Sequence, residues 1–141
     1  MYNFRKSKKG FTLIELMVVV VIIGVLALLG LRLYLTQIAK SNNALVKANA
    51  GTVQTTIQGD LADADPAAVE LDWLAGTLVT RTGIHNPLDK QHQATFPVSQ
   101  ATAEAGEVWV RYDVSAACFY INGLDAAGTA PVYTTDLVAK Y

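Results

Sequence analysis

The feature that most constrains this chain is an apolar run near its N-terminus. From Phe11 to Leu31, 21 residues carry a single charge, on Glu15, and the last 16 of them have no polar side chain. A helix of about 20 apolar residues spans the hydrocarbon core of a bilayer. Strands rarely pass about ten residues, so the length favours a helix. We therefore predict a membrane-spanning helix over residues 11–31, apolar on all sides.

Charges flank this run unevenly. The first ten residues include Arg5, Lys6, Lys8 and Lys9 and no acid, which gives them a charge of +4. The rest of the chain holds seven basic and twelve acidic residues, a net charge of −5, although the whole chain carries only −1. Basic residues beside a membrane helix stay on the cytoplasmic side. We therefore expect the N-terminus inside the cell and residues 32–141 outside the cytoplasm.

A secretory signal peptide and a plain membrane anchor are the simpler interpretations of this segment. A signal peptide has a shorter apolar core and a small-residue cleavage site, but Arg32 and Tyr34 follow the run closely. A plain anchor explains the length but not Glu15, because a carboxylate at mid-helix costs roughly 2.5–3.5 kcal/mol and less near the interface. No basic residue within the segment can pair with Glu15, so its partner must come from elsewhere.

The residues around Glu15 form a recognisable motif. Residues 9–16, KGFTLIEL, followed by the long Val/Ile/Leu run, resemble the prepilin signal of the type IV pilin family. That family includes pilus subunits, minor and competence pilins, and the pseudopilins of type II secretion. The resemblance implies that a membrane peptidase cuts between Gly10 and Phe11 and methylates the new N-terminus on Phe11. It also implies that Glu15 pairs with the terminal ammonium of a neighbouring subunit during assembly.

Elementary chemistry is consistent with these implied roles. Gly10 has no side chain, so a peptidase can approach its backbone closely. Pairing of Glu15 with an ammonium would offset the cost of burying the carboxylate and would fix the axial register of the subunits. A repeated contact that does not close on itself generates an open filament.

The sequence departs from many relatives of the family in two respects. No proline follows the apolar run, since the first proline is Pro66, so any kink must come from Gly24 or Gly30. The chain has one cysteine, Cys118, and so cannot close a C-terminal disulfide loop. We expect Cys118 to be a small core residue, with an intermolecular disulfide as the alternative.

An amphipathic pattern predicts that the helix continues beyond the membrane. Apolar residues recur at spacings of three and four, with polar residues opposite them. We expect this helix to end near Gln58, with Gly59 and Asp60 as stop signals. The apolar stripe comprises Leu31, Leu35, Ile38, Leu45, Val46, Ala50, Val53, Ile57 and Leu61, and the polar face comprises Gln37, Lys40, Asn43, Lys47, Gln54 and Gln58.

The remaining segments predict a small α+β head. Asp65 caps a short helix from Pro66 to Ala75, which Gly76 ends, and residues 82–93 form a loop. Inward-facing residues in 108–114 are Val108, Val110, Tyr112 and Val114, alternating with Trp109, Arg111 and Asp113. Strands are expected at residues 95–99 (an edge strand or a lead-in), 108–114, 117–121 and 131–135, with turns at Asn122-Gly123 and Ala127-Gly128. We predict an antiparallel meander packed on the outer half of the long helix.

Two groups of residues raise the question of a metal. Acidic residues gather around the short helix, and two histidines with an aspartate lie in the following loop. Neither group has the spacing of a known ligand motif, so we interpret them as capping or solvated residues and expect no metal or cofactor. The acids are Asp60, Asp63, Asp65, Glu70 and Asp72, and the loop residues are His85, Asp89 and His92.

Together these features predict a structural subunit of a type IV pilus with no catalytic residues. Its parts are a cleaved leader (1–10), a transmembrane and assembly helix (11–31), and an outer helix with an extracytoplasmic head (32–141). The resemblance implies as partners further copies of the chain, the prepilin peptidase and methyltransferase, and an inner-membrane assembly platform. The precursor would lie in the inner membrane before it enters an extracellular pilus.

Other functions remain open at this stage. The chain can also be a type II secretion pseudopilin, or a minor or competence pilin in DNA uptake. A net charge of −5 outside the leader argues against a general phosphate-binding surface. An enzyme on a membrane anchor is the remaining alternative, but no phosphate loop, nucleophile elbow or paired-carboxylate motif supports it.

Overall fold

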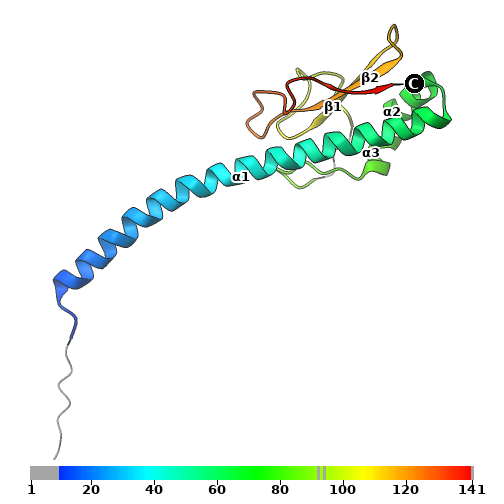
Figure 1. Ribbon diagram of the computed structural model, residues 1–141. Coiled ribbons are helices and arrows are strands. Elements are labelled where there is room, and N and C mark those ends of the chain that lie inside the picture. Colours follow the sequence, from blue (N-terminus) through cyan, green and yellow to red (C-terminus); the bar gives the residue numbers. More distant parts are fainter. Residues whose placement is uncertain (1–9, 92, 94, 141) are drawn as a thin grey trace, which may run out of the picture. The chain divides into compact units, whose positions relative to one another are not determined.

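One long helix joins the apolar run to the rest of the chain. In the computed structural model, which describes residues 10–91, 93 and 95–140, α1 extends without interruption from Leu13 to Asp63 (Figure 1). The chain divides into two units, one ending at Gln37 and one beginning at Ile38, and each is described by itself. The predicted leader residues 1–9 and His92 lie outside the described residues.

In the first unit, α1 is apolar and exposed on all sides. It is long and apolar enough to cross a membrane, and its most apolar 18-residue window has a mean hydropathy of 2.9 with none of its residues buried. The helix passes through Gly24 and Gly30 without a break, so neither glycine ends it. An apolar surface of this extent needs either lipid or other protein to cover it.

In the second unit, one stripe of α1 forms the base of the core. Five residues of the predicted stripe are at most 2% exposed: Val46, Ala50, Val53, Ile57 and Leu61. This part of the amphipathic prediction is confirmed. The other members of the predicted stripe are 39–58% exposed, namely Leu31, Leu35, Ile38 and Leu45. The stripe is therefore covered by the head only from Val46 onward.

The predicted end of α1 near Gln58 is wrong by five residues. Gly59 and Asp60 lie inside the helix, and α1 ends at Asp63. Burial of Leu61 extends the stripe by another turn and outweighs the weak helix propensity of glycine. The helix stops because Pro66 disfavours the helical conformation in the residue before it, and Asp65 is accordingly extended, with φ −66° and ψ 146°.

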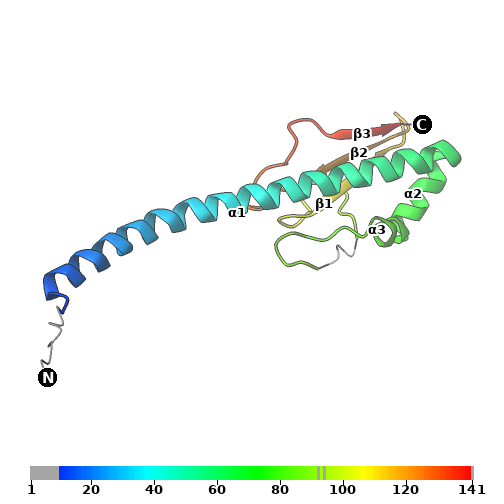
Figure 2. The same ribbon diagram turned by 60° about the horizontal axis from the view of Figure 1, so that its bottom comes forward.

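A three-stranded antiparallel meander covers the stripe. Strands β1 (Val108–Asp113), β2 (Cys118–Gly123) and β3 (Leu137–Lys140) lie in the order β1-β2-β3. They lie along the second half of α1 (Figure 2). Their inward side chains join the stripe in one buried cluster, which includes Val108, Val110, Phe119, Ile121 and Ala139. The predicted α+β fold class and the sheet on the outer half of the helix are confirmed.

Several predictions for individual strand residues are corrected. Val114 lies beyond β1 and is 77% exposed, whereas Trp109, expected to face solvent, is 7% exposed. Residues 95–99 form no strand, but the Pro97 carbonyl accepts the Val110 N–H at 2.9 Å, so the segment runs beside β1 as a lead-in. Cys118 is 2% exposed, which confirms its place among buried residues.

The third strand lies later in the chain than predicted. Residues 131–135 form no strand, apart from a single bridge between Pro131 and Leu124. A proline cannot donate to a ladder, and the Tyr133 N–H is bound by the side chain of Asn122 at 3.1 Å. Four residues, Leu137–Lys140, instead pair with β2.

The predicted turn at Asn122-Gly123 is also wrong, because both residues lie in β2. Gly123 is needed for close packing, since a Cβ there would collide with the side chain of Val46 on α1. Asn122 is 1% exposed, and its amide organises the following loop. The turn at Ala127-Gly128 is confirmed, with Gly128 at φ +68° and its N–H bound to the Asp125 carbonyl.

Glutamine side chains bind both outer edges of the sheet. On β1, the Gln93 amide donates to the Val108 carbonyl and accepts the Val108 N–H at 3.0 Å. On β3, Gln54 donates to the Val138 carbonyl at 3.0 Å. These amides occupy backbone groups that an edge strand otherwise leaves open.

Gln58 completes the cover of β3. Its amide donates to the Lys140 carbonyl at 2.6 Å and accepts the Lys140 N–H at 3.1 Å. Gln54 and Gln58 belong to the predicted polar face of α1, so part of that face binds the sheet rather than only water.

Two short helices follow α1. Helix α2 (Pro66–Leu74) begins where predicted and ends one residue earlier, and Asp65 is its N-cap residue although its side chain makes no capping hydrogen bond. Helix α3 (Thr77–Thr82) was not predicted. Arg81 on α3 pairs with Asp60 on α1 at 2.8 Å and with Asp72 on α2 at 3.4 Å. The hydrogen bond and charge of Asp60, aided by Asp72, raise the pKa of Arg81. One guanidinium thus links all three helices.

We predict that Asn122→Ala destabilises the head by roughly 3 kcal/mol. The amide donates to the Tyr133 carbonyl and to Asp136, and accepts the N–H groups of Gly123 and Tyr133, at 2.8–3.1 Å. Removing it leaves the buried Gly123 N–H and the half-buried groups of Tyr133 and Asp136 without this partner, and an unsatisfied buried group costs about 1–3 kcal/mol. Urea unfolding of the protein in detergent measures the change. Gln100→Ala, at an exposed position, is the control and should stay within about 0.5 kcal/mol; equal effects of the two variants would contradict the prediction.

Candidate assembly site at the start of α1

The single carboxylate of the apolar run lies in the first turn of α1. Glu15 Oε2 accepts the Thr12 backbone N–H at 2.9 Å and the Thr12 hydroxyl at 2.8 Å. The Glu15 N–H in turn approaches Thr12 Oγ1 at 3.3 Å. This reciprocal arrangement is a capping box, which satisfies N–H groups that a helix start leaves unpaired.

The three residues singled out from the sequence lie together at this end of the chain. Gly10 and Phe11 precede α1, and Glu15 lies in its first turn. Phe11 is 87% exposed, and the space around Gly10 is open, because a Cβ there would meet nothing within 4 Å. The peptide bond between Gly10 and Phe11 is therefore accessible. Glu15 is bonded to neither of these two residues but to Thr12.

Thr12 is the functional residue that the sequence reasoning missed. The segment holds no basic partner for Glu15, but a hydroxyl and a backbone N–H can also bind a carboxylate. A threonine three residues before a glutamate, ahead of an apolar run, is the sequence signature of a capping box, and residues 12–15 have that spacing. The capping box satisfies one carboxylate oxygen. Among the described residues, Glu15 Oε1 makes no hydrogen bond.

The other candidate residues belong to the head and form no reactive group. Among residues 10–91, 93 and 95–140, no three His, Cys, Asp or Glu side chains gather as metal ligands do. Within the predicted acidic cluster, Asp60 and Asp72 pair with Arg81. His85 is exposed, as expected of a surface histidine. The start of α1, with a single carboxylate in an exposed apolar helix, is therefore the candidate functional site.

The start of α1 also matches a known family of proteins. Residues 5–31 match the family model described as "Prokaryotic N-terminal methylation motif". The match spans the basic residues, the Gly10–Phe11 bond and Glu15.

Similarity to known proteins extends into the head. The chain is 35% identical over 114 residues to the type IV major fimbrial protein FimA of Dichelobacter nodosus, covering 79% of this chain and 67% of the relative. It is 32% identical over 131 residues to a probable minor fimbrial protein of the same organism, covering 75% of this chain and 82% of the relative. Fimbrial protein EcpB of Eikenella corrodens is 46% identical over 56 residues, covering 40% and 35% of the two chains.

The shared part differs between relatives. A further FimA protein of Dichelobacter nodosus aligns over only 50% of its own length, at 39% identity. No solved structure matches the chain significantly. The aligned share of this chain therefore ranges from 40% to 79% among these relatives.

We predict that Thr12→Val weakens the first turn of α1 by about 1 kcal/mol, because it removes the hydroxyl that both donates to and accepts from Glu15. The Glu15 amide should then exchange with solvent about fivefold faster, as hydrogen-exchange mass spectrometry in detergent would measure. Thr12→Ser keeps the hydroxyl and serves as the control. Equal exchange in the two variants would show that the hydroxyl contributes nothing.

Proposed function

Because the chain belongs to the type IV fimbrial protein family, we propose that it is a structural subunit, cleaved between Gly10 and Phe11 and polymerised through α1 into an extracellular filament. The observation that carries this proposal is the bare apolar helix with one carboxylate in its first turn. Monomeric soluble proteins rarely expose so much contiguous apolar surface. A filament core covers it once subunits leave the membrane.

Cleavage would change the chemistry beside Glu15. In the precursor, the Phe11 nitrogen is an amide and carries no charge. Cutting after Gly10 turns it into an ammonium, which can pair with the Glu15 carboxylate of a neighbouring subunit. Thr12 holds one carboxylate oxygen and leaves Oε1 for that ammonium. The capping box then serves as a positioning device, because it fixes the carboxylate before the partner arrives.

Pairing at this point would align the subunits. A carboxylate left unpaired in an apolar medium is costly, so an error in register by one residue is strongly disfavoured. The surrounding side chains supply apolar surface but no directional contact. We therefore assign register to Glu15 and Phe11, with affinity supplied by residues 16–31.

The remaining parts of the proposal follow from this role. The precursor lies in the inner membrane with its N-terminus inside, where a prepilin peptidase and methyltransferase acts on it. An assembly platform in that membrane then extracts it into the filament. We propose no catalytic activity, because the role requires only polymerisation.

A minor subunit of the same filament is the second candidate. It is favoured by the alignment with a probable minor fimbrial protein, which covers 82% of that relative. The ratio of this chain to other subunits in purified filaments separates the two roles. No observation in the described part of the head favours a type II secretion pseudopilin or a competence pilin.

We predict that the mature protein begins at an N-methylated Phe11. Intact-mass and N-terminal peptide mass spectrometry on membranes and sheared filaments would measure this. Gly10→Val should block cleavage, because a branched side chain hinders the approach to the bond, and should leave the precursor in the membrane. Recovery of the wild-type protein with an intact Met1 would overturn the processing proposal.

We predict that Glu15→Gln lowers the yield of sheared filaments at least tenfold while leaving processing intact. Glutamine keeps the size of the side chain and an oxygen that can accept from Thr12, but it lacks the charge that attracts an ammonium. Glu15→Asp, which keeps the charge on a shorter chain, should assemble better than Glu15→Gln. Normal yield from Glu15→Gln would contradict the pairing role of the carboxylate.

A further inference from the structure

Helix α2 is apolar on two faces, of which only one is covered. Val69 and Trp73 are buried in the core, whereas Leu71 and Leu74 are 68% and 61% exposed. Glu70 and Asp72 separate the two faces, and an exposed apolar patch is a candidate contact surface. The exposed apolar face of α2 comprises Ala67, Ala68, Leu71 and Leu74, and the exposed Ala75 follows it at the end of the helix.

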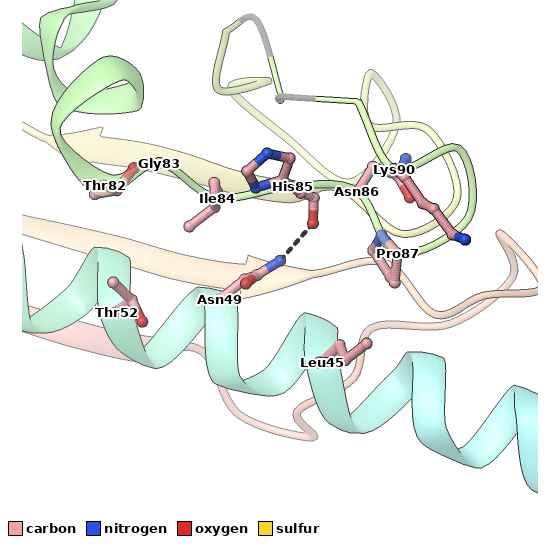
Figure 3. Close-up of a pocket in the computed structure, with 10 residues that line it drawn as sticks. All are labelled: Leu45, Asn49, Thr52, Thr82, Gly83, Ile84, His85, Asn86, Pro87 and Lys90. Carbon is pink, nitrogen blue, oxygen red and sulfur yellow. Dashed lines mark hydrogen bonds between the residues drawn. The ribbon is translucent and has the colours of Figure 1, made fainter.

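A groove of about 470 Å³ lies elsewhere on the same head, between α1 and the segment that follows α3 (Figure 3). Its apolar lining includes Leu45, Ile84 and Pro87. Leu45 is 51% exposed although it belongs to the apolar stripe found in the sequence. The head therefore leaves part of that stripe uncovered inside a concave site.

Hydrogen bonds join the segment that lines the groove to α1 and to a neighbouring loop. Asn49 on α1 donates to the His85 carbonyl at 2.8 Å, the bond drawn in Figure 3. Asn86 donates to the Ala105 carbonyl and accepts the Leu88 N–H, both at 2.9 Å. A preformed groove costs less to occupy than one that must be ordered by its ligand.

The two surfaces differ in charge. Lys90 lines the groove, and none of its lining residues is acidic. The nearby carboxylate of Asp89 accepts the N–H of Gln91 within its own loop at 2.8 Å. On α2, Asp72 is paired with Arg81, but Glu70 at the other side of the exposed face makes no ion pair with any described residue.

We propose that the exposed face of α2 on one subunit docks into the groove of another copy, with Glu70 facing Lys90. The inference rests on the proposed function, which supplies many copies in one filament. Two different surfaces meet in this contact, so it can repeat along an open filament without closing on itself. Asn49 beside the groove lies 14 residues before the end of α1, about 21 Å along the helix. The contact therefore stacks heads along the direction of α1.

Cysteine cross-linking in assembled filaments tests this contact. Ala68→Cys places a thiol at the edge of the α2 face, and Thr52→Cys places one in the groove wall with little change in size. The native Cys118 is 2% exposed and should not react. With a short bis-maleimide, the double variant should give a ladder of dimers, trimers and longer products. The control pair, Ala68→Cys with the exposed Thr134→Cys, should give at least tenfold less.

The outcomes separate this inference from the function on which it rests. Filaments that form normally but give no ladder above the control pair overturn the contact and leave the pilus role intact. Dimers from Ala68→Cys alone would also overturn it, since they indicate two α2 faces meeting symmetrically. Absence of filaments from the wild-type chain would instead contradict the proposed function.

A charge exchange tests the polar part of the contact. Lys90→Glu and Glu70→Lys should each lower the filament yield several-fold, because each places like charges together. The two changes combined should restore most of the yield. A combined variant that assembles no better than either single variant would overturn the assignment of Glu70 to Lys90.

Discussion

Burial of one stripe of α1 beneath the sheet is the interaction on which the rest of the structure depends. Residues from Val46 to Leu61 form the base of the core, and the strands, α2 and α3 are arranged around it. The same helix has no such cover in its first unit, where the apolar side chains stay exposed. One continuous helix therefore carries two different surfaces. The head covers one stripe of its second half, whereas its first half is apolar around the full circumference and needs lipid or other protein to cover it.

The sequence predicted these surfaces well because each has a strong pattern. An uninterrupted apolar run and a stripe at helical spacing are both long, and length makes such patterns reliable. Shorter segments were predicted less well. Residues 131–135 have strand-forming side chains, yet the Asn122 amide binds their backbone and the strand forms at Leu137–Lys140 instead. The Asn-Gly pair predicts a turn at Gly123, whereas a glycine is needed there because Val46 packs closely against it. That contact exists only in the folded structure.

The residues of the candidate site are conspicuous in the sequence, but the hydrogen bonds that Glu15 makes with Thr12 were not predicted. Gly10, Phe11 and Glu15 stand out because a charge in an apolar run and a glycine before it are unusual in any sequence. Thr12 was visible at the same spacing and was passed over, because a search for a partner of opposite charge ignores hydroxyl and amide donors. The sequence could not predict that glutamine side chains bind the edges of the sheet. Nothing in the neighbouring sequence distinguishes these glutamines from solvated ones; they are Gln54, Gln58 and Gln93.

Those glutamines have a consequence for how such subunits survive at high density. Where many copies of the chain lie close together, their sheets collide repeatedly, and an open strand edge would let two sheets pair. Amide groups already seated on Val108, Val138 and Lys140 deny a colliding strand its hydrogen bonds at those positions. The occupied edges therefore disfavour pairing between the sheets of neighbouring copies at these positions.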